Sequence, residues 1–250
     1  MKITVIGRSP SWQDAGGACS GYLVTEGSDS VLLECGSGVF AKLREVRDHR
    51  SLDAVVISHL HADHFLDLIP FSYALTYGPP VEGPRPRLIL PPGGLATLRT
   101  ICGTFDNALL VEEAFDASEY DPSAGLAIGG LRFDFQLVSH FIEAWAIAVS
   151  GSSGGRFVFG ADTGPCDALP AFAQAADLLM LEATFAADAP AGEGHLTPIQ
   201  AGEIAQAAGA ARLVLTHASD CLDLEASVAA AAAAFAGPVE MAREASSWDV

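Results

Sequence analysis

Short apolar runs alternate with helix-forming stretches along the whole chain. The runs are rich in valine, isoleucine, leucine and phenylalanine and are bounded by glycine, proline or serine, which is the pattern of β-strands. The strands we expect are residues 3–6, 22–25, 31–34, 54–58, 87–90, 131–138, 144–149, 156–160, 178–181 and 212–216. They come first in hairpin-like groups and later in β-α-β order, which predicts an α/β fold.

The stretches between these strands predict helices. We expect them at residues 39–47, 63–77, 95–103, 167–175, 198–208 and 224–235. The helix at 198–208 has the clearest boundaries, because Thr197 can cap it and Gln200 completes a T-x-x-Q capping box. Pro198 suits the first helical position, and Gly209 follows as terminator.

The organisation of the chain favours a single domain. A length of 250 residues has room for one large domain or two small ones, and no stretch is long enough to be a linker between two. The proline-rich segment 78–92 is interpreted as a rigid surface connection within the domain. We therefore expect one domain over residues 1–250.

The charge of the chain limits its partners. The formal net charge is −18, with 13 basic residues against 31 acidic ones. Proteins that bind duplex DNA or RNA normally carry clustered lysine and arginine that neutralise phosphates. The arginines that come closest to forming such a cluster are interpreted as part of a solvated face: Arg44, Arg47, Arg50, Arg85 and Arg87. A large nucleic acid is not expected as a partner, whereas a small anion attracted by bound cations is compatible with the sequence.

Cysteine usage and hydropathy indicate a cytoplasmic protein without a membrane partner. No run of apolar residues is long enough to cross a bilayer, and the chain begins with a strand pattern instead of a signal peptide. The five cysteines are scattered and include no C-x-x-C pair: Cys19, Cys35, Cys102, Cys166 and Cys221. This argues against a disulfide framework and a structural zinc site, and predicts small buried thiols in a reducing compartment.

The stretch SHLHADHF, residues 58–65, carries the strongest chemical signal. It follows the apolar run AVVIS, so it begins where a buried strand ends. His59 and His61 are alternate residues of an extended segment and can bind one metal ion together. If a helix starts near Asp63, then Asp63 and His64 turn towards a second ion beside the first.

Other residues of metal-binding type follow predicted strands. His140 ends FDFQLVSH, Asp162 follows RFVFGAD, and His217 ends RLVLTH, so an active-site edge of the sheet is expected. His195 differs, because it lies in the loop GEGHLT just before a capped helix. It could be a further ligand, a proton donor or an ordinary loop residue. His49, in the polar segment RDHRS, is expected to lie outside the site.

This ordered series resembles the metallo-β-lactamase-fold hydrolases along nearly the whole chain. LEATF at 181–185 and GHLT at 194–197 are similar to the ribonuclease Z and small phosphodiesterase branch. SHLHADHFLDL, DTGPCD and the segment GHLT…QAG are most similar to atypical bacterial cyclic nucleotide phosphodiesterases. The resemblance implies a four-layer αββα sandwich, with the metal site at one edge of the β-sandwich, and a homodimer.

The resemblance also implies a dinuclear centre. The implied metal ligands are His59, His61 and His140 on the first ion, Asp63, His64 and His217 on the second, and Asp162 bridging both. The candidate catalytic residues are Asp63 and His195, and His195 would stabilise the transition state or protonate the leaving oxygen. Glu182 is preceded by Leu181 where ribonuclease Z proteins have histidine, and Glu34 stands where the superfamily more often has aspartate. Both glutamates are expected to support the ligands from behind.

Hydrolysis of a small phosphodiester, with a 3′,5′-cyclic nucleotide as one candidate, is the function we expect. Two divalent ions would hold a bridging hydroxide for in-line attack and offset the charge of the transition state. Zinc is the expected metal, and this ligand set also suits manganese, iron or nickel. The alternatives are a ribonuclease Z-type tRNA 3′-processing endonuclease, which would need a basic arm that the sequence lacks, and a metal-binding protein without catalysis. β-Lactam hydrolysis is not favoured, because such enzymes usually work in the periplasm.

Overall fold

Two seven-stranded sheets form the centre of the computed structural model, which describes residues 1–79, 83–190 and 192–250. Across the first sheet the strands are β14 (Ser247–Asp249), β1 (Lys2–Gly7), β2 (Gly21–Glu26), β3 (Asp29–Leu33), β4 (Ala54–Val56), β5 (Arg87–Leu90) and β6 (Asp116–Glu119). Across the second they are β13 (Val239–Met241), β12 (Leu213–Thr216), β11 (Leu178–Glu182), β10 (Arg156–Phe159), β9 (Ala144–Ser150), β8 (Leu131–Val138) and β7 (Leu126–Ile128).

Each sheet is mixed in the same way. In the first sheet the strands from β14 to β3 pair antiparallel, and those from β3 to β6 pair parallel. In the second, the strands from β7 to β10 are antiparallel and those from β10 to β13 are parallel. The parallel strands need crossovers, and most of the helices belong to these connections.

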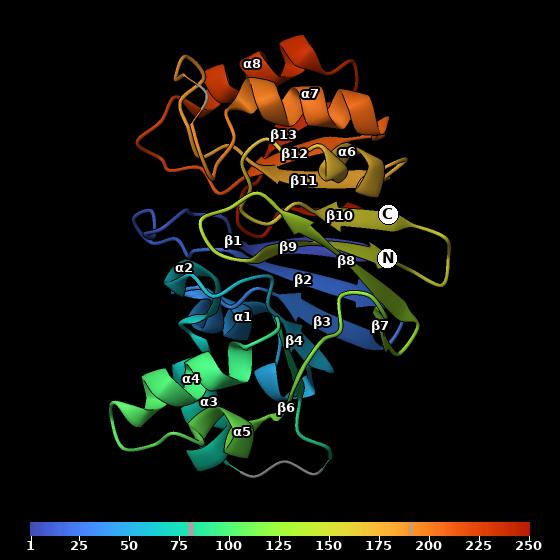
Figure 1. Cartoon of the computed structure of the whole chain (residues 1–250). Helices are drawn as coiled ribbons and strands as arrows, with labels where there is room; N and C mark the ends of the chain where they lie inside the picture. The colour runs from blue at the N-terminus through green and yellow to red at the C-terminus, as the bar shows by residue number, and fades with distance from the viewer. Residues whose placement is uncertain (80–82, 191) are drawn as a thin grey trace.

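The helices form the two outer layers (Figure 1). The first sheet is covered by α1 (Val39–Val46), α2 (Ala62–Phe65), α3 (Leu68–Tyr77), α4 (Gly94–Gly103) and α5 (Leu110–Ala114), with a short 3-10 turn η1 (His49–Ser51) after α1. The second sheet is covered by α6 (Ala168–Phe172), α7 (Pro198–Ala208) and α8 (Leu224–Ala234). The predicted αββα sandwich is therefore confirmed.

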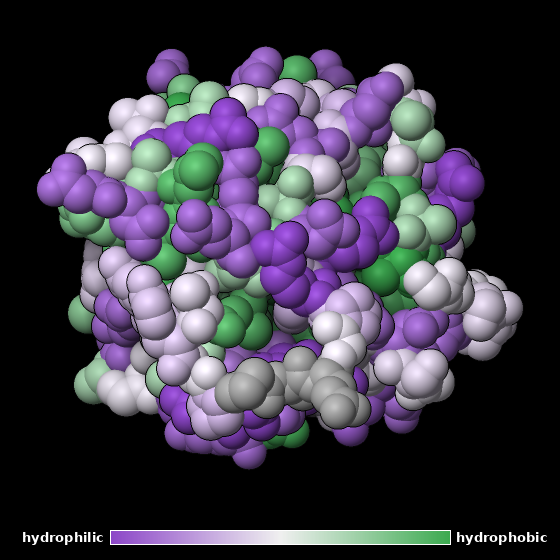
Figure 2. Space-filling view, turned by 90° about the horizontal axis from the view of Figure 1, so that it is seen from below, coloured by the Kyte–Doolittle hydropathy of each residue, from purple (hydrophilic) through white to green (hydrophobic). Residues whose placement is uncertain are grey.

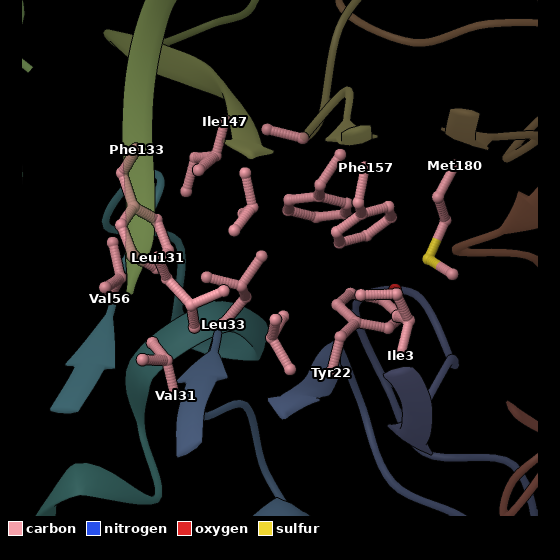
Figure 3. Packing of buried hydrophobic residues seen from close by; sticks show 14 of the residues in the cluster. Ile3, Tyr22, Val31, Leu33, Val56, Leu131, Phe133, Ile147, Phe157 and Met180 are labelled. Carbon is pink, nitrogen blue, oxygen red and sulfur yellow. The ribbon is translucent and has the colours of Figure 1, made fainter. Parts of the chain in front are cut away.

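A core of apolar side chains fills the space between the two sheets. Figure 3 shows Tyr22, Val31 and Leu33 of the first sheet facing Phe133 and Phe157 of the second. Successive residues of a strand point to opposite faces, so the neighbouring residues of these strands pack instead against the helices on the outer side. This is why runs such as VLL in β3 and AVV in β4 are apolar at every position.

The predicted strands are all present, and the differences lie at the edges of the sheets and in two helices. Four short strands were not predicted, namely β6, β7, β13 and β14, and neither was α5. The strands are outer ones of three or four residues that are mostly half-buried or exposed, so they lack the long apolar run that marks the central strands. The predicted helix at 167–175 is shorter, and Ala175 has a left-handed backbone with φ of 52°.

The predicted helix at 63–77 is wrong as a single element. It is divided into α2 and α3, with Leu66 and Asp67 between them. The backbone N–H of Asp67 donates to the carbonyl of Cys35, and its carboxylate accepts from the backbone N–H of Phe40. These bonds to a distant part of the chain replace helical ones, and they allow α2 to point its side chains into the site.

The predicted connection at 78–92 is described in part, because residues 80–82 lie outside the described residues. Figure 2 shows the face near this connection, where hydrophilic side chains predominate and apolar ones lie between them in separate groups. In the part of the chain that the structure describes, no helix has the length and apolar character needed to cross a membrane.

Candidate metal centre

The residues singled out from the sequence meet at one edge of the β-sandwich. The segment His59–His64 follows β4 of the first sheet, and α2 begins at Ala62 within it. From the second sheet, His140 follows β8, Asp162 follows β10 and His217 follows β12. The loops after these strands therefore bring histidine and aspartate side chains from both sheets to one place.

Four residues form a first group of donor atoms. They are His59, His61, His140 and Asp162, and one ligand atom of each lies within 4.8 Å of all the others. His140 Nε2 lies 2.9 Å from His61 Nδ1 and 4.0 Å from Asp162 Oδ2, and His59 Nε2 is also 4.0 Å from that oxygen. The set of three imidazoles and one carboxylate suits a divalent transition metal.

A second group lies directly beside the first. It consists of Asp63, His64, Asp162 and His217, whose ligand atoms also lie within 4.8 Å of one another. His217 Nε2 is 3.1 Å from Asp63 Oδ2 and 3.3 Å from Asp162 Oδ2, and His64 Nε2 is 3.3 Å from Asp162 Oδ1. Asp162 belongs to both groups and directs one oxygen towards His64 and the other towards His217.

The ring nitrogens that point away from the centre are held by the protein. His64 Nδ1 donates to Glu34, His140 Nδ1 donates to the Gly194 carbonyl at 2.7 Å, and His59 Nδ1 contacts Ser58 Oγ at 2.9 Å. His217 Nδ1 contacts the hydroxyl of Thr184 at 2.8 Å. Such contacts fix the orientation of each ring and direct its Nε2 to the centre. Hydrogen bonds of the same kind orient the histidine ligands of metal sites.

Glu34 and Glu182 support the centre from opposite sides. Glu34 is fully buried and accepts from the backbone N–H of Ser58 at 2.7 Å and from His64 Nδ1 at 3.0 Å. Glu182 accepts from the backbone N–H of Thr163 at 2.7 Å, from the Thr184 hydroxyl and from His195 Nδ1. One carboxylate thus joins the ligand segment to the end of β3, and the other joins the His195 loop to the loop that carries Asp162.

The backbone at the centre is held in an uncommon conformation. Glu34, Ala161 and His217 have φ values of 61°, 54° and 49°, in the left-handed region that non-glycine residues seldom adopt. Residues of this kind are found at functional sites, where the surrounding structure must hold them in place. Here the arrangement turns the chain sharply before Asp162 and at His217, so that both side chains face the groups described above.

Burial and charge set the protonation of the donors. Burial lowers the pKa of His59, His61 and His140, which favours neutral imidazoles with a free lone pair. Burial also opposes protonation of His64, but the carboxylates of Asp162, Asp63 and Glu34 outweigh it and raise the pKa of that ring. Although burial opposes it, the hydrogen bonds and charges of the neighbouring histidines hold the pKa of Asp63 well below its usual range. Neutral histidines and ionised aspartates are the forms in which these residues bind metal.

The donors fit a divalent cation in three respects. His59 Nε2 is buried without a hydrogen-bond partner among the described residues, although buried polar atoms nearly always have one. His140 Nδ1 donates to the Gly194 carbonyl, so a neutral His140 presents the lone pair of its Nε2 beside His61 Nδ1, 2.9 Å away. Several carboxylates are buried here, while the buried charged residues of the described ranges include no lysine or arginine.

His195 lies in the wall of the centre, on the loop between β11 and α7. Its ring centroid is 5.0 Å from that of His140 and 5.7 Å from that of His217. The side chain is 16% exposed, in contrast to the buried ligand candidates on either side. Burial opposes protonation of His195, but its hydrogen bond to Glu182 outweighs that effect and raises its pKa. The capping box of Thr197 and Gln200, which was predicted, begins α7 two residues later.

The remaining predictions about histidine and cysteine had mixed outcomes. His49 lies away from the centre and packs edge-on against Phe40 and Phe71, which stack on each other. All five cysteines are free, but only Cys19, Cys35 and Cys102 are buried. Cys166 is half-buried and Cys221 is exposed, so the prediction of five buried thiols is wrong for these two because both lie in surface loops.

Sequence reasoning missed the residues that hold the ligands from behind. Ser58, Thr184 and the carbonyl of Gly194 contact ring nitrogens of the centre. Ser58 and Thr184 stand beside singled-out residues in the sequence, which is the signal that could have identified them. Gly194 is distant from its partner His140 in the sequence, so only the fold brings the two together.

Comparison with known proteins agrees with this fold. Residues 29–218 match the family model described as beta-lactamase superfamily domain. The probable metallo-hydrolase YhfI of Bacillus subtilis is 34% identical over 218 residues, covering 87% of this chain and 86% of that protein. The crystal structure of YhfI superposes with a TM-score of 0.88 at 29% identity and covers 99% of both chains. Ribonuclease Z of Myxococcus xanthus is 28% identical over 292 residues, covering 97% of this chain and 95% of the relative.

Proposed function

The chain belongs to the beta-lactamase superfamily of metallo-hydrolases, and on this basis we propose that it hydrolyses a small phosphodiester, such as a 3′,5′-cyclic nucleotide. The observation that carries the proposal is the pair of adjacent donor groups that share Asp162, with His195 beside them. Two divalent ions held in this way lower the pKa of water and offset the negative charge of a phosphoryl group.

The ligand roles follow from the two groups. We assign His59, His61 and His140 to one ion and Asp63, His64 and His217 to the other, with Asp162 shared. Zinc is the proposed metal because imidazole nitrogen and carboxylate oxygen both suit it, and manganese, iron or nickel would fit the same donors. Asp63 stays ionised and is also the proposed acceptor that orients the attacking water.

His195 is the proposed general acid. Its Nδ1 donates to Glu182 Oε1 at 2.9 Å, which leaves Nε2 as the nitrogen able to give a proton to the leaving oxygen. Glu182 raises the pKa of His195, so the ring holds its proton more firmly than an isolated histidine. A phosphodiester needs such a donor, because the alkoxide that departs is a poor leaving group.

The surface charge supports a small substrate over a large nucleic acid. At −18 the chain would repel an extended phosphate backbone, whereas a single phosphodiester can be attracted by bound cations alone. The relative in Myxococcus xanthus is named a ribonuclease Z, so tRNA 3′-processing is the second candidate.

A cytoplasmic homodimer is the proposed state of the protein. The cytoplasmic location is in keeping with the five cysteines, all of which are free.

A phosphodiesterase assay tests the proposal. The purified protein is loaded with zinc or manganese, metal content is measured, and turnover is followed on bis-p-nitrophenyl phosphate, cyclic AMP and a precursor tRNA. We expect hydrolysis of the first two and no salt-sensitive binding of the tRNA. Absence of turnover on both small substrates, with metal bound, would refute the phosphodiesterase, and cleavage of the tRNA would establish the second candidate instead.

A further inference from the structure

Two phenylalanines flank the proposed general acid. The ring centroid of Phe141 lies 5.8 Å from that of His195 and 5.1 Å from that of His140. On another side of the same imidazole, the ring of Phe185 lies 5.9 Å away with an interplanar angle of 87°. Both aromatic side chains are thus in the layer next to the donor groups, although neither can bind a metal or move a proton.

Phe141 is exposed to an unusual degree for its position. Its relative exposure is 63%, against 40% for Phe105, the other phenylalanine among the exposed apolar residues, whereas the side chain of neighbouring His140 is buried. Single apolar residues on a surface are common and do not by themselves indicate a binding site. An aromatic ring this close to the donor groups is different, because a substrate held at that centre lies within reach of it.

One edge of the exposed ring lies against the backbone of Gly194. A Cβ atom added at Gly194 would come within 2.5 Å of two edge carbons of Phe141, so a side chain there would displace the ring from this position. Gly194 has φ of +76°, and its carbonyl accepts a hydrogen bond from His140 Nδ1. Phe185 packs in the same manner on Gly192, where an added Cβ would lie 2.7 Å from its ring. The loop that carries His195 therefore seats both rings on its glycines.

We infer that Phe141 is the stacking platform for an aromatic ring of the substrate, namely the nucleobase of a small nucleotide phosphodiester. This inference rests on the proposed function and names its substrate class. A ring that rests on Gly194 by one edge and is open to solvent offers a flat surface to a planar base, and every base has a π-face that can use it. Because a phenyl ring has no hydrogen-bonding group, the platform binds adenine and guanine alike.

The seating on Gly194 also connects the platform to catalysis. Gly194 contacts Phe141 with its backbone, accepts from His140 and directly precedes His195. A base stacked on Phe141 would therefore place its phosphodiester close to both the donor groups and the general acid. Phe141 is a specificity residue in this account, whereas His140 and His195 take part in the chemistry.

The test compares substrates with and without a base. We expect Phe141→Ala to lower kcat/KM for cyclic AMP on the order of 10- to 100-fold, which is the loss typical of one stacked base. The same variant should keep its rate on a base-free analogue, methyl riboside 3,5-cyclic phosphate. Phe141→Trp should retain activity on cyclic AMP. Phe105→Ala, which removes an exposed phenyl ring after α4, is the matched control and should change neither rate.

Binding measurements separate this inference from the proposed function. Calorimetry with the metal-loaded protein compares AMP with ribose 5-phosphate, and the wild type should prefer AMP about 10-fold while Phe141→Ala should not. If cyclic AMP is not hydrolysed but this preference is present, the proposed reaction fails and the platform stands. Equal affinity for the two ligands in the wild type would overturn the platform. The platform would also be overturned if Phe141→Ala weakened the binding of AMP and of ribose 5-phosphate equally, or if that variant dissociated a dimer. In either case the ring would serve the fold or the contact with a second copy of the chain.

Discussion

The Nδ1 atom of His195 lies 2.9 Å from Oε1 and 3.1 Å from Oε2 of Glu182, so one carboxylate holds the imidazole through both oxygens. Glu182 is buried, and it also accepts from the backbone N–H groups of Thr163 and Leu196. The orientation of His195 is therefore set by a carboxylate that two backbone N–H groups hold in turn. This relationship leaves Nε2 for proton transfer and leads to the first prediction.

Glu182→Gln should slow catalysis without emptying the metal centre. The amide keeps the shape of the side chain but weakens its bond to His195, and supporting contacts of this kind are typically worth about 10- to 100-fold in activity. The measurement is kcat on cyclic AMP, whose leaving oxygen needs a proton, together with metal content. Glu193→Gln, the same change at an exposed position of the same loop, should leave both unchanged. Loss of metal by Glu182→Gln would contradict a role through His195.

His195→Ala should retain metal and lose rate. Removing a general acid typically costs about 10²- to 10⁴-fold in kcat. The loss should be smaller for a substrate with an acidic leaving group, such as bis-p-nitrophenyl phosphate, than for cyclic AMP, because p-nitrophenolate departs without a proton. A site that loses its metal in this variant would show that His195 is a ligand, and an equal loss on both substrates would argue against proton donation.

Glu34→Gln should weaken metal binding more than it changes the fold. Glu34 orients His64 through Nδ1 and fixes the backbone of Ser58, so its replacement leaves the ligand segment less well ordered. We expect metal affinity to fall roughly 10- to 100-fold, measured by competition with a chelator. Asp53→Asn, which alters another carboxylate that accepts a backbone N–H, is a control away from the centre and should leave metal affinity unchanged.

Removal of the metal should destabilise the protein. Without cations the carboxylates of Asp63 and Asp162 are buried beside one another with only histidine protons to balance them. A ligand present at 1,000 times its Kd stabilises the native state by about 4 kcal/mol. Thermal unfolding after dialysis against a chelator should show a lower Tm that returns when zinc or manganese is added. An unchanged Tm, with metal removal verified, would indicate that the donors hold no cation in the native protein.

Much of this fold could be predicted from the sequence, because its central strands are buried on both faces. Runs such as those of β3 and β4 are apolar throughout, and the capping box at Thr197 depends only on local residues. The break at Asp67 could not be predicted, since it arises from bonds to Cys35 and Phe40. Strand β6 is mostly exposed and polar, and backbone pairing with β5 is what makes it a strand.

The candidate centre, like the fold, could be predicted from the sequence only in part. The spacing of His59, His61, Asp63 and His64 is local, and the strand-end positions of His140, Asp162 and His217 follow from the predicted sheet. Which donors share an ion depends on how the two sheets pack, and the structure supplies that information. Phe141 gave no signal in the sequence, because its importance lies in the contact with Gly194 and the distance to His195.

Metal stoichiometry against turnover tests the central claim most directly. Metal-free protein is titrated with zinc or manganese, and bound metal per chain is measured alongside hydrolysis of bis-p-nitrophenyl phosphate. The account predicts that activity rises in step with the second ion and is complete at about two ions per chain, while Asp162→Asn loses the paired site and its activity. Full activity with a single bound ion, or an inactive protein with both ions bound, would contradict it.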